Sequence, residues 1–117
     1  MLKIYGIKNC DSVRKAMKYL NEFEIPYTFI DFKTSKVTEE EITYWLKHTD
    51  IKTLFNTRST TYKTLKLNKL NLNDTEKMTY LLKETMLVKR PVIIFDNEVI
   101  VGYNRDEYLE KLPKKEG

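Results

Sequence analysis

The spacing of apolar residues changes along the chain, and each change predicts a different element. Leu2–Tyr5 is a short apolar segment that ends at Gly6, which predicts a first strand. Over residues 11–24 the apolar positions recur at helical spacing, and they are Val13, Ala16, Met17, Leu20 and Phe23. Tyr27–Phe32 is rich in β-branched and aromatic residues, which predicts a second strand. The first third is therefore predicted to be a βαβ unit with parallel strands.

The middle of the chain, roughly residues 38–88, is predicted to be a helical insertion. Thr38 and Glu41 have the spacing of a capping box before the apolar residues Ile42 and Trp45. Short helical turns are expected over residues 51–55 and 62–65, followed by a turn-rich connector and a longer helix. Helix starts are predicted from their capping residues, which are Asp11 or Ser12, Thr38, Asp74 and Asn104.

The last third returns to strand patterns. Residues 92–95 form a continuous apolar run typical of a strand buried on both faces, and Val99–Val101 predicts the returning strand of a hairpin. A final helix is expected to follow Gly102 and to end at Pro113. The predicted class is α/β. It is a thioredoxin-like fold with a four-stranded mixed sheet and a helical insertion between strands 2 and 3, in a single domain over residues 1–117.

Composition and charge argue against several classes of function. The chain has 117 residues, one cysteine and one histidine, so we expect no internal disulfide, no zinc or iron–sulfur ligand set and no metal site. The net charge of +4 comes from lysines interleaved with acidic residues, which argues against direct nucleic-acid binding. No apolar run reaches membrane-span length and residues 1–8 do not resemble a secretory signal, so we expect a cytoplasmic protein with no membrane partner.

Cys10 is the candidate nucleophile, because it precedes the first predicted helix directly. A helix N-terminus offers unpaired amides and the positive end of the helix dipole, and both favour a thiolate over a thiol. Lys8 and Arg14 would add positive charge, whereas Asp11 would oppose it slightly. The competing interpretation is that Cys10 is a small buried filler, and its position alone does not decide between the two.

Four segments, in order along nearly the whole chain, resemble the arsenate reductase-like (ArsC/Spx) family of the thioredoxin-fold superfamily. Tyr5–Ala16 resembles its nucleophile loop, and Asn56–Ser59 resembles a segment of its helical insertion. Val88–Pro91 resembles the basic residue and proline before the third strand, and Val101–Glu107 the glycine-led loop before the last helix. The likeness is strongest to the monothiol YffB-type and Spx-like members.

The resemblance implies a site and a reaction. In arsenate reductases of this class the cysteine thiolate attacks arsenate, arginines hold its oxygens, and glutathione and glutaredoxin complete the reduction. The resemblance makes Cys10 catalytic. It assigns the binding of the oxyanion to three residues, which are Arg58, Arg90 and Arg105. It assigns supporting roles to three others, which are Asn9, Arg14 and Pro91, and it implies a cis peptide bond before Pro91. Isolated arginines are also commonly surface residues paired with carboxylates, and that interpretation stays open for Arg58 and Arg105.

The chain departs from Spx regulators at two places. They carry Cys-x-x-Cys at this helix start, whereas this chain has Val13 in place of the second cysteine. They also carry a glycine in the insertion segment that engages RNA polymerase, whereas residues 48–52 of this chain contain no glycine. A lone Cys10 must be resolved by an outside thiol. We therefore expect a monomeric reductase of a small oxyanion or a disulfide. Glutathione or another low-molecular-weight thiol would be its co-substrate, glutaredoxin a candidate partner, and no cofactor would be bound. The alternatives are a non-catalytic module that binds RNA polymerase and a structural descendant with a vestigial cysteine.

Overall fold

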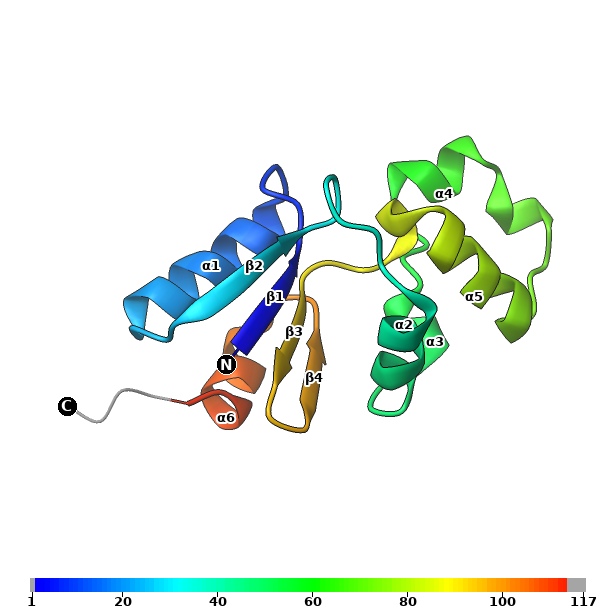
Figure 1. The fold of residues 1–117 in the computed structure, drawn as a ribbon. Helices are drawn as coiled ribbons and strands as arrows, with labels where there is room; N and C mark the ends of the chain where they lie inside the picture. Colours follow the sequence, from blue (N-terminus) through cyan, green and yellow to red (C-terminus); the bar gives the residue numbers. More distant parts are fainter. Residues whose placement is uncertain (1, 114–117) are drawn as a thin grey trace. The chain divides into compact units, whose positions relative to one another are not determined.

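The computed structural model describes residues 2–113, and these fall into two compact units (Figure 1). One unit combines the described residues up to Ser35 with those from Arg90 onward, and the other is Lys36–Lys89. The second unit coincides closely with the insertion predicted over residues 38–88. In the described part of the chain, no helix is long and apolar enough to span a membrane.

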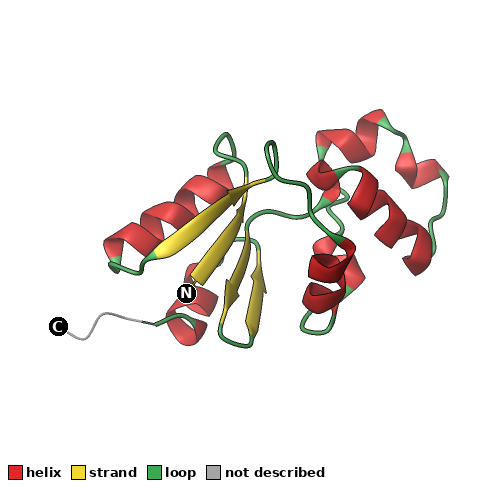
Figure 2. Ribbon diagram, viewed as in Figure 1, coloured by secondary structure: helices red, strands yellow, loops and turns green. Residues whose placement is uncertain are grey.

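The first unit is built on a mixed sheet, which has four strands within the described residues and the order β2-β1-β3-β4 (Figure 2). The strands are β1 (Leu2–Gly6), β2 (Tyr27–Asp31), β3 (Val92–Phe95) and β4 (Glu98–Val101). β1 pairs with β2 in parallel, whereas the pairs β1–β3 and β3–β4 are antiparallel. This topology confirms the predicted βαβ unit, the hairpin and the thioredoxin-like sheet.

Two helices, α1 (Asp11–Glu22) and α6 (Arg105–Lys111), cover the same face of this sheet. The register aligns Ile4 with Ile93 and Ile93 with Ile100, so one row of side chains crosses three strands. These three side chains belong to one buried cluster with residues of α1 and α6. Tyr19 of α1 and Tyr108 of α6 meet edge to face within it, with ring centroids 5.3 Å apart. The two helices therefore lie side by side on the sheet.

The second unit is helical. It contains α2 (Glu39–Leu46), α3 (Ile51–Leu54), α4 (Thr60–Thr64) and α5 (Asp74–Lys83), with 3₁₀ turns η1 (Leu67–Lys69) and η2 (Thr85–Leu87). Its buried core includes Ile42, Trp45, Leu54, Leu81 and Leu87. An isolated antiparallel bridge between Phe55 and Val88 joins the end of α3 to the end of the unit.

Helix starts follow the sequence with small corrections. The capping box of Thr38 and Glu41 is present, and Asn104 caps α6. The cap of α5 is Asn73 and not Asp74, because the amide oxygen of Asn73 accepts from the Glu76 amide in a second capping box. At α1 the N-cap is Cys10 itself, so the predicted cap at Asp11 or Ser12 is wrong by one or two residues. The predicted helix end at residue 24 is also two residues late.

Candidate functional site

The loop that carries Cys10 is fixed by a close approach between β1 and α1. Val13, fully buried in the first turn of α1, lies against Gly6 at the end of β1. A Cβ atom at Gly6 would come within 2.6 Å of Val13 Cγ2, a distance that real contacts do not reach. Only glycine therefore allows the helix to begin this close to the strand. The connecting residues, Ile7–Asn9, carry the chain from strand to helix.

Cys10 is the N-cap of α1, with extended backbone at φ −146° and ψ 124°. Its carbonyl accepts the first helical hydrogen bond from the Arg14 amide at 2.9 Å. Within the described part of the chain, its side chain makes no capping hydrogen bond, and the thiol is free and partly exposed. The Sγ atom thus lies at the end of a helix of 12 residues, beside first-turn amides that no side chain of the N-cap occupies.

Arg14 forms hydrogen bonds with both residues that flank Cys10. Its guanidinium donates to Asn9 Oδ1 at 2.9 Å and to Asp11 Oδ1 at 3.1 Å. The Arg14–Asp11 pair is exposed, with 59% and 88% of the two side chains accessible, so its contribution to stability is small. The Arg14 guanidinium instead links Asn9 and Asp11, the residues on either side of Cys10, and so holds the loop around the thiol. Asn9 and Arg14, predicted as supporting residues, are therefore adjacent to Cys10 in the structure.

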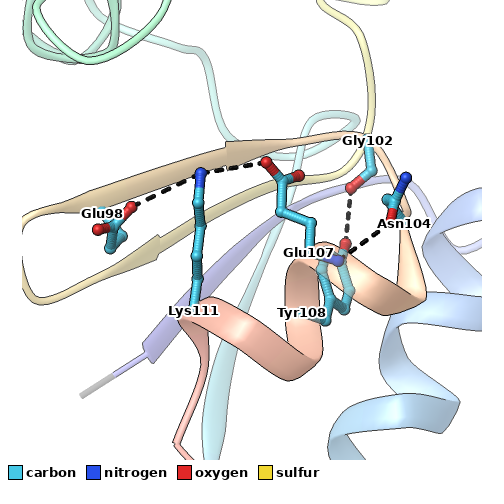
Figure 3. Close-up of polar contacts among 6 residues, drawn as sticks. All are labelled: Glu98, Gly102, Asn104, Glu107, Tyr108 and Lys111. Carbon is cyan, nitrogen blue, oxygen red and sulfur yellow. Dashed lines mark hydrogen bonds and ion pairs between the residues drawn. The ribbon is translucent and has the colours of Figure 1, made fainter.

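The Arg90–Pro91 peptide bond is cis, which confirms that prediction. Arg90 is half-buried, and Pro91 is buried at the entrance to β3. The Pro91 carbonyl accepts from the Gly102 amide at 2.8 Å, and the Gly102 carbonyl accepts from the Tyr108 hydroxyl at 2.7 Å (Figure 3). Gly102 has a φ of 84°, a conformation that favours glycine. Burial raises the pKa of Tyr108 well above its ordinary range, so the phenol remains a donor.

The predicted arginines do not all gather at the thiol. Arg105 lies over the rings of Tyr19 and Phe23, 5.5 and 5.6 Å from their centroids, and its guanidinium is 3.8 Å from Glu22. Tyr19 is nine residues beyond Cys10 on α1, which is about 14 Å along a helix axis. The structure therefore does not bring Arg105 together with Cys10.

Arg58 belongs to the second unit, where it is exposed in the turn before α4. Its backbone amide donates to Asn56 Oδ1 at 3.1 Å, and Ser59 caps α4 by accepting from the Tyr62 amide. The Asn-Thr-Arg-Ser segment thus has a local structural role as a helix start. The assignment of Arg58 to oxyanion binding stays a prediction.

Two features of the first unit were missed by sequence reasoning. The Gly6–Val13 contact joins residues of a strand and a helix, and the sequence marks Gly6 only as a strand end. The Tyr108–Gly102 hydrogen bond could have been suspected from a tyrosine inside a short amphipathic helix, because a buried hydroxyl needs an acceptor. Among residues 2–113, no group of three or more His, Cys, Asp or Glu side chains is placed to hold a metal ion.

Comparisons with known proteins add a family assignment to this geometry. The model of the ArsC family matches residues 5–111. The global transcriptional regulator Spx of Staphylococcus epidermidis is 34% identical over 117 residues, which cover 98% of this chain and 89% of that protein.

Solved structures agree with the observed fold. A YffB protein has a TM-score of 0.89 at 29% identity, over 97% of this chain and 100% of that one. An arsenate reductase (ArsC) related protein from Brucella melitensis has a TM-score of 0.73 at 32% identity, over 94% of this chain and 92% of that one. The similarity therefore covers both units.

Proposed function

Because the chain belongs to the ArsC family, we propose that it is a thiol-dependent reductase in which Cys10 is the nucleophile. The observation that carries this proposal is the placement of the only cysteine as the N-cap of α1, free and partly exposed. A cysteine kept only as core filler would be buried in the apolar cluster. Cys10 instead lies at the helix end that best supports a thiolate.

The lone thiol defines the order of steps with a mixed disulfide. The Cys10 thiolate attacks one sulfur, a new S–S bond forms, and the other sulfur leaves as a thiolate that takes up a proton. Position 13 holds a buried valine, so the new disulfide is not resolved from within the first turn. A glutathione thiolate then attacks it, which releases a disulfide and regenerates the Cys10 thiolate. Glutathione is oxidised and the substrate is reduced.

Arsenate would be reduced by a similar sequence of steps that consumes one additional external thiol. Cys10 attacks arsenic(V) and water leaves, which gives a thioester of arsenate. Glutathione then attacks the Cys10 sulfur, so that arsenic leaves as arsenite with two more electrons and Cys10 forms a mixed disulfide. A second glutathione, or a glutaredoxin thiol, resolves that disulfide. The balance is one arsenate and two thiols giving arsenite, one disulfide and water. Arg90, which precedes β3, is our candidate for holding the anionic group of either substrate.

The test is a turnover assay with purified protein. Arsenate and a glutathione mixed disulfide are supplied separately, each with and without glutathione and glutaredoxin. We expect turnover with at least one substrate only when an outside thiol is present, and complete loss in Cys10→Ser. Ser12→Ala is the matched control, because it alters the same helical turn and leaves the thiol in place. Turnover that survives Cys10→Ser, or that needs no added thiol, contradicts the proposal.

A second candidate is a regulator that binds RNA polymerase, and the Spx relative at 34% identity over 117 residues supports it. The buried Val13 removes a dithiol switch from such a regulator, so no disulfide within this turn would control its binding. The discriminating measurement is a pull-down with purified RNA polymerase. Stoichiometric binding that survives Cys10→Ser, together with no turnover in the assay above, supports the regulator and contradicts the reductase.

A further inference from the structure

The interleaving of basic and acidic residues along the chain stops over residues 51–73. This segment holds no acidic residue and five basic ones, which are Lys52, Arg58, Lys63, Lys66 and Lys69. It therefore carries a formal charge of +5, whereas the charges in the rest of the chain sum to −1. All five basic side chains are exposed, and none of them forms an ion pair with a described residue. The positive charge of the protein is thus concentrated on the second unit and is not neutralised there.

Two leucines are exposed in the same segment, between the end of α4 and the start of α5 (Figure 1). Leu65, the C-cap of α4, is 42% exposed, and Leu70 is 52% exposed. Among the described residues, Tyr44 on α2 is the only other exposed large hydrophobic side chain. Leu67, between the two leucines, is buried and anchors the segment to the core of the unit. Exposed apolar side chains that gather among charged ones are typical of a contact surface.

A cavity of about 190 Å³ lies beside these leucines. The apolar part of its lining consists of Phe55, Tyr62, Leu67 and Leu72. Leu65 and Leu70 each precede a leucine of this lining by two residues. The half-buried Lys77 also lines the cavity, with its ammonium 6.0 Å from the centroid of the Phe55 ring, and no acidic residue is among the described lining residues. A cavity of about 150 Å³ with an apolar lining can hold a benzene ring, so this one has room for one aromatic or leucine side chain.

We propose that residues 63–72 and this cavity form a docking surface for an acidic segment of a partner protein. One aromatic or leucine side chain of that segment enters the cavity, and its carboxylates face the lysines of the surface, which are Lys63, Lys66, Lys69 and Lys77. The lysines would also attract a nucleic acid or an anionic lipid surface, but neither supplies a side chain to fill the cavity or to cover the leucines. An acidic segment with an apolar residue uses the charge and the cavity together. The inference goes beyond the proposed reductase activity, because Cys10 is not part of this surface.

The test is a titration of the full chain with a synthetic peptide of glutamates around one central phenylalanine, followed by amide chemical shifts in NMR spectra. Two comparison peptides carry serine in place of the phenylalanine, or lysine in place of every glutamate. We expect saturable shifts over residues 55–77 and no binding of the lysine peptide. The serine peptide should bind about tenfold more weakly, because it buries no apolar side chain in the cavity. Cys10→Ser should bind the peptide equally well, so failure of the proposed reductase activity leaves this result unaffected. Equal binding of the phenylalanine and serine peptides overturns the proposal, as does tighter binding of a DNA duplex or of phosphatidylglycerol vesicles at this surface.

Two exposed residues of the surface can be changed without disturbing the core, and each has a matched control in the same unit. Leu70→Ser should weaken binding of the phenylalanine peptide several-fold, whereas Tyr44→Ser, at the exposed tyrosine of α2, should leave it unchanged. Lys69→Glu reverses a charge within the surface and should also weaken binding several-fold. Lys36→Glu is its control, because it reverses an exposed lysine outside residues 51–73. Far-UV circular dichroism confirms that the variants are folded. Equal effects of either variant and its control mean that the peptide binds by net charge or apolar contact anywhere on the protein, and the proposal fails.

Discussion

Removing the hydroxyl group of each buried tyrosine in turn should change the stability of the protein differently at the two rings that meet in the core of the first unit. Tyr108→Phe and Tyr19→Phe are the same chemical change, at side chains that are 0% and 1% exposed. The Tyr108 hydroxyl donates to the Gly102 carbonyl (Figure 3), whereas that of Tyr19 has no partner among the described residues. The pair therefore differs in one hydrogen bond.

The magnitude follows from that bond. Its short length of 2.7 Å and the burial of both residues indicate a hydrogen bond that water cannot replace easily. Loss of the donor removes about 1 kcal/mol of net bonding and leaves a buried carbonyl unsatisfied, so Tyr108→Phe should lower the free energy of unfolding by about 2 kcal/mol. At roughly 4 °C per kcal/mol for a chain of this size, the melting temperature should fall by about 8 °C. Tyr19→Phe should not lower the free energy of unfolding and should raise it by about 1 kcal/mol, because it removes a buried hydroxyl that has no partner among the described residues.

The assay is urea unfolding of both variants, followed by far-UV circular dichroism. Fluorescence of the single tryptophan is not sufficient, since Trp45 lies in the second unit and the substitutions lie in the first. Hydrogen exchange at the Gly102 amide, which donates to Pro91, gives a local readout of the same change. Equal stabilities for the two variants, or a loss below about 0.5 kcal/mol in Tyr108→Phe, would refute the reasoning from hydrogen-bond satisfaction.

Other substitutions test the backbone and one titrating cap. Gly6→Ala should lower the free energy of unfolding by about 1–3 kcal/mol, because the new methyl group overlaps Val13. The same substitution should cost less in a Val13→Ala background. Urea midpoints of the wild type, the two single variants and the double variant measure this coupling. Gly102→Ala should cost about 1–2 kcal/mol by the same measurement, since φ is 84°. The Thr53 amide holds the pKa of Asp50 below its ordinary 3.8. Asp50 therefore contributes stability above pH 3.8 that is lost as the pH falls through its lower folded value. In Asp50→Asn the tryptophan-monitored urea midpoint should vary less with pH between about 5 and 3, and an unchanged pH profile would contradict this assignment.

The sequence predicted the elements well where the signal is local. The Thr38–Glu41 capping box and the hairpin depend on residues a few positions apart, and Thr38 with Glu41 needed nothing from the rest of the chain. The placement of Cys10 at the start of α1 followed from the strand end at Gly6 and the helical spacing beyond it. Because these signals lie within one stretch of chain, tertiary packing did not alter them by more than two residues.

The sequence was less informative about which side chains meet. Arg105 was grouped with Cys10 because both lie in segments that resemble one family, yet its guanidinium packs on Tyr19 and Phe23. That outcome depends on α6 packing beside the middle of α1. Such packing between two helices is a tertiary contact, and no local sequence motif encodes it. The unpartnered hydroxyl of Tyr19 is similarly invisible in the sequence, because only the packed structure removes it from water. Periodicity predicts burial of such residues and does not predict their hydrogen-bond partners.

The fit of Val13 against Gly6 also determines how the proposed reaction would depend on concentration. A second cysteine in that turn would resolve an adduct at Cys10 in a first-order step, independent of any other molecule. With valine there, the lifetime of the adduct would be inversely proportional to the concentration of thiolate around the protein. The fraction of protein carrying an adduct would then rise whenever the surrounding thiol pool becomes oxidised or depleted. In the proposed reaction, a side chain that fills space beside a glycine would thus make the occupancy of Cys10 a measure of the thiols outside.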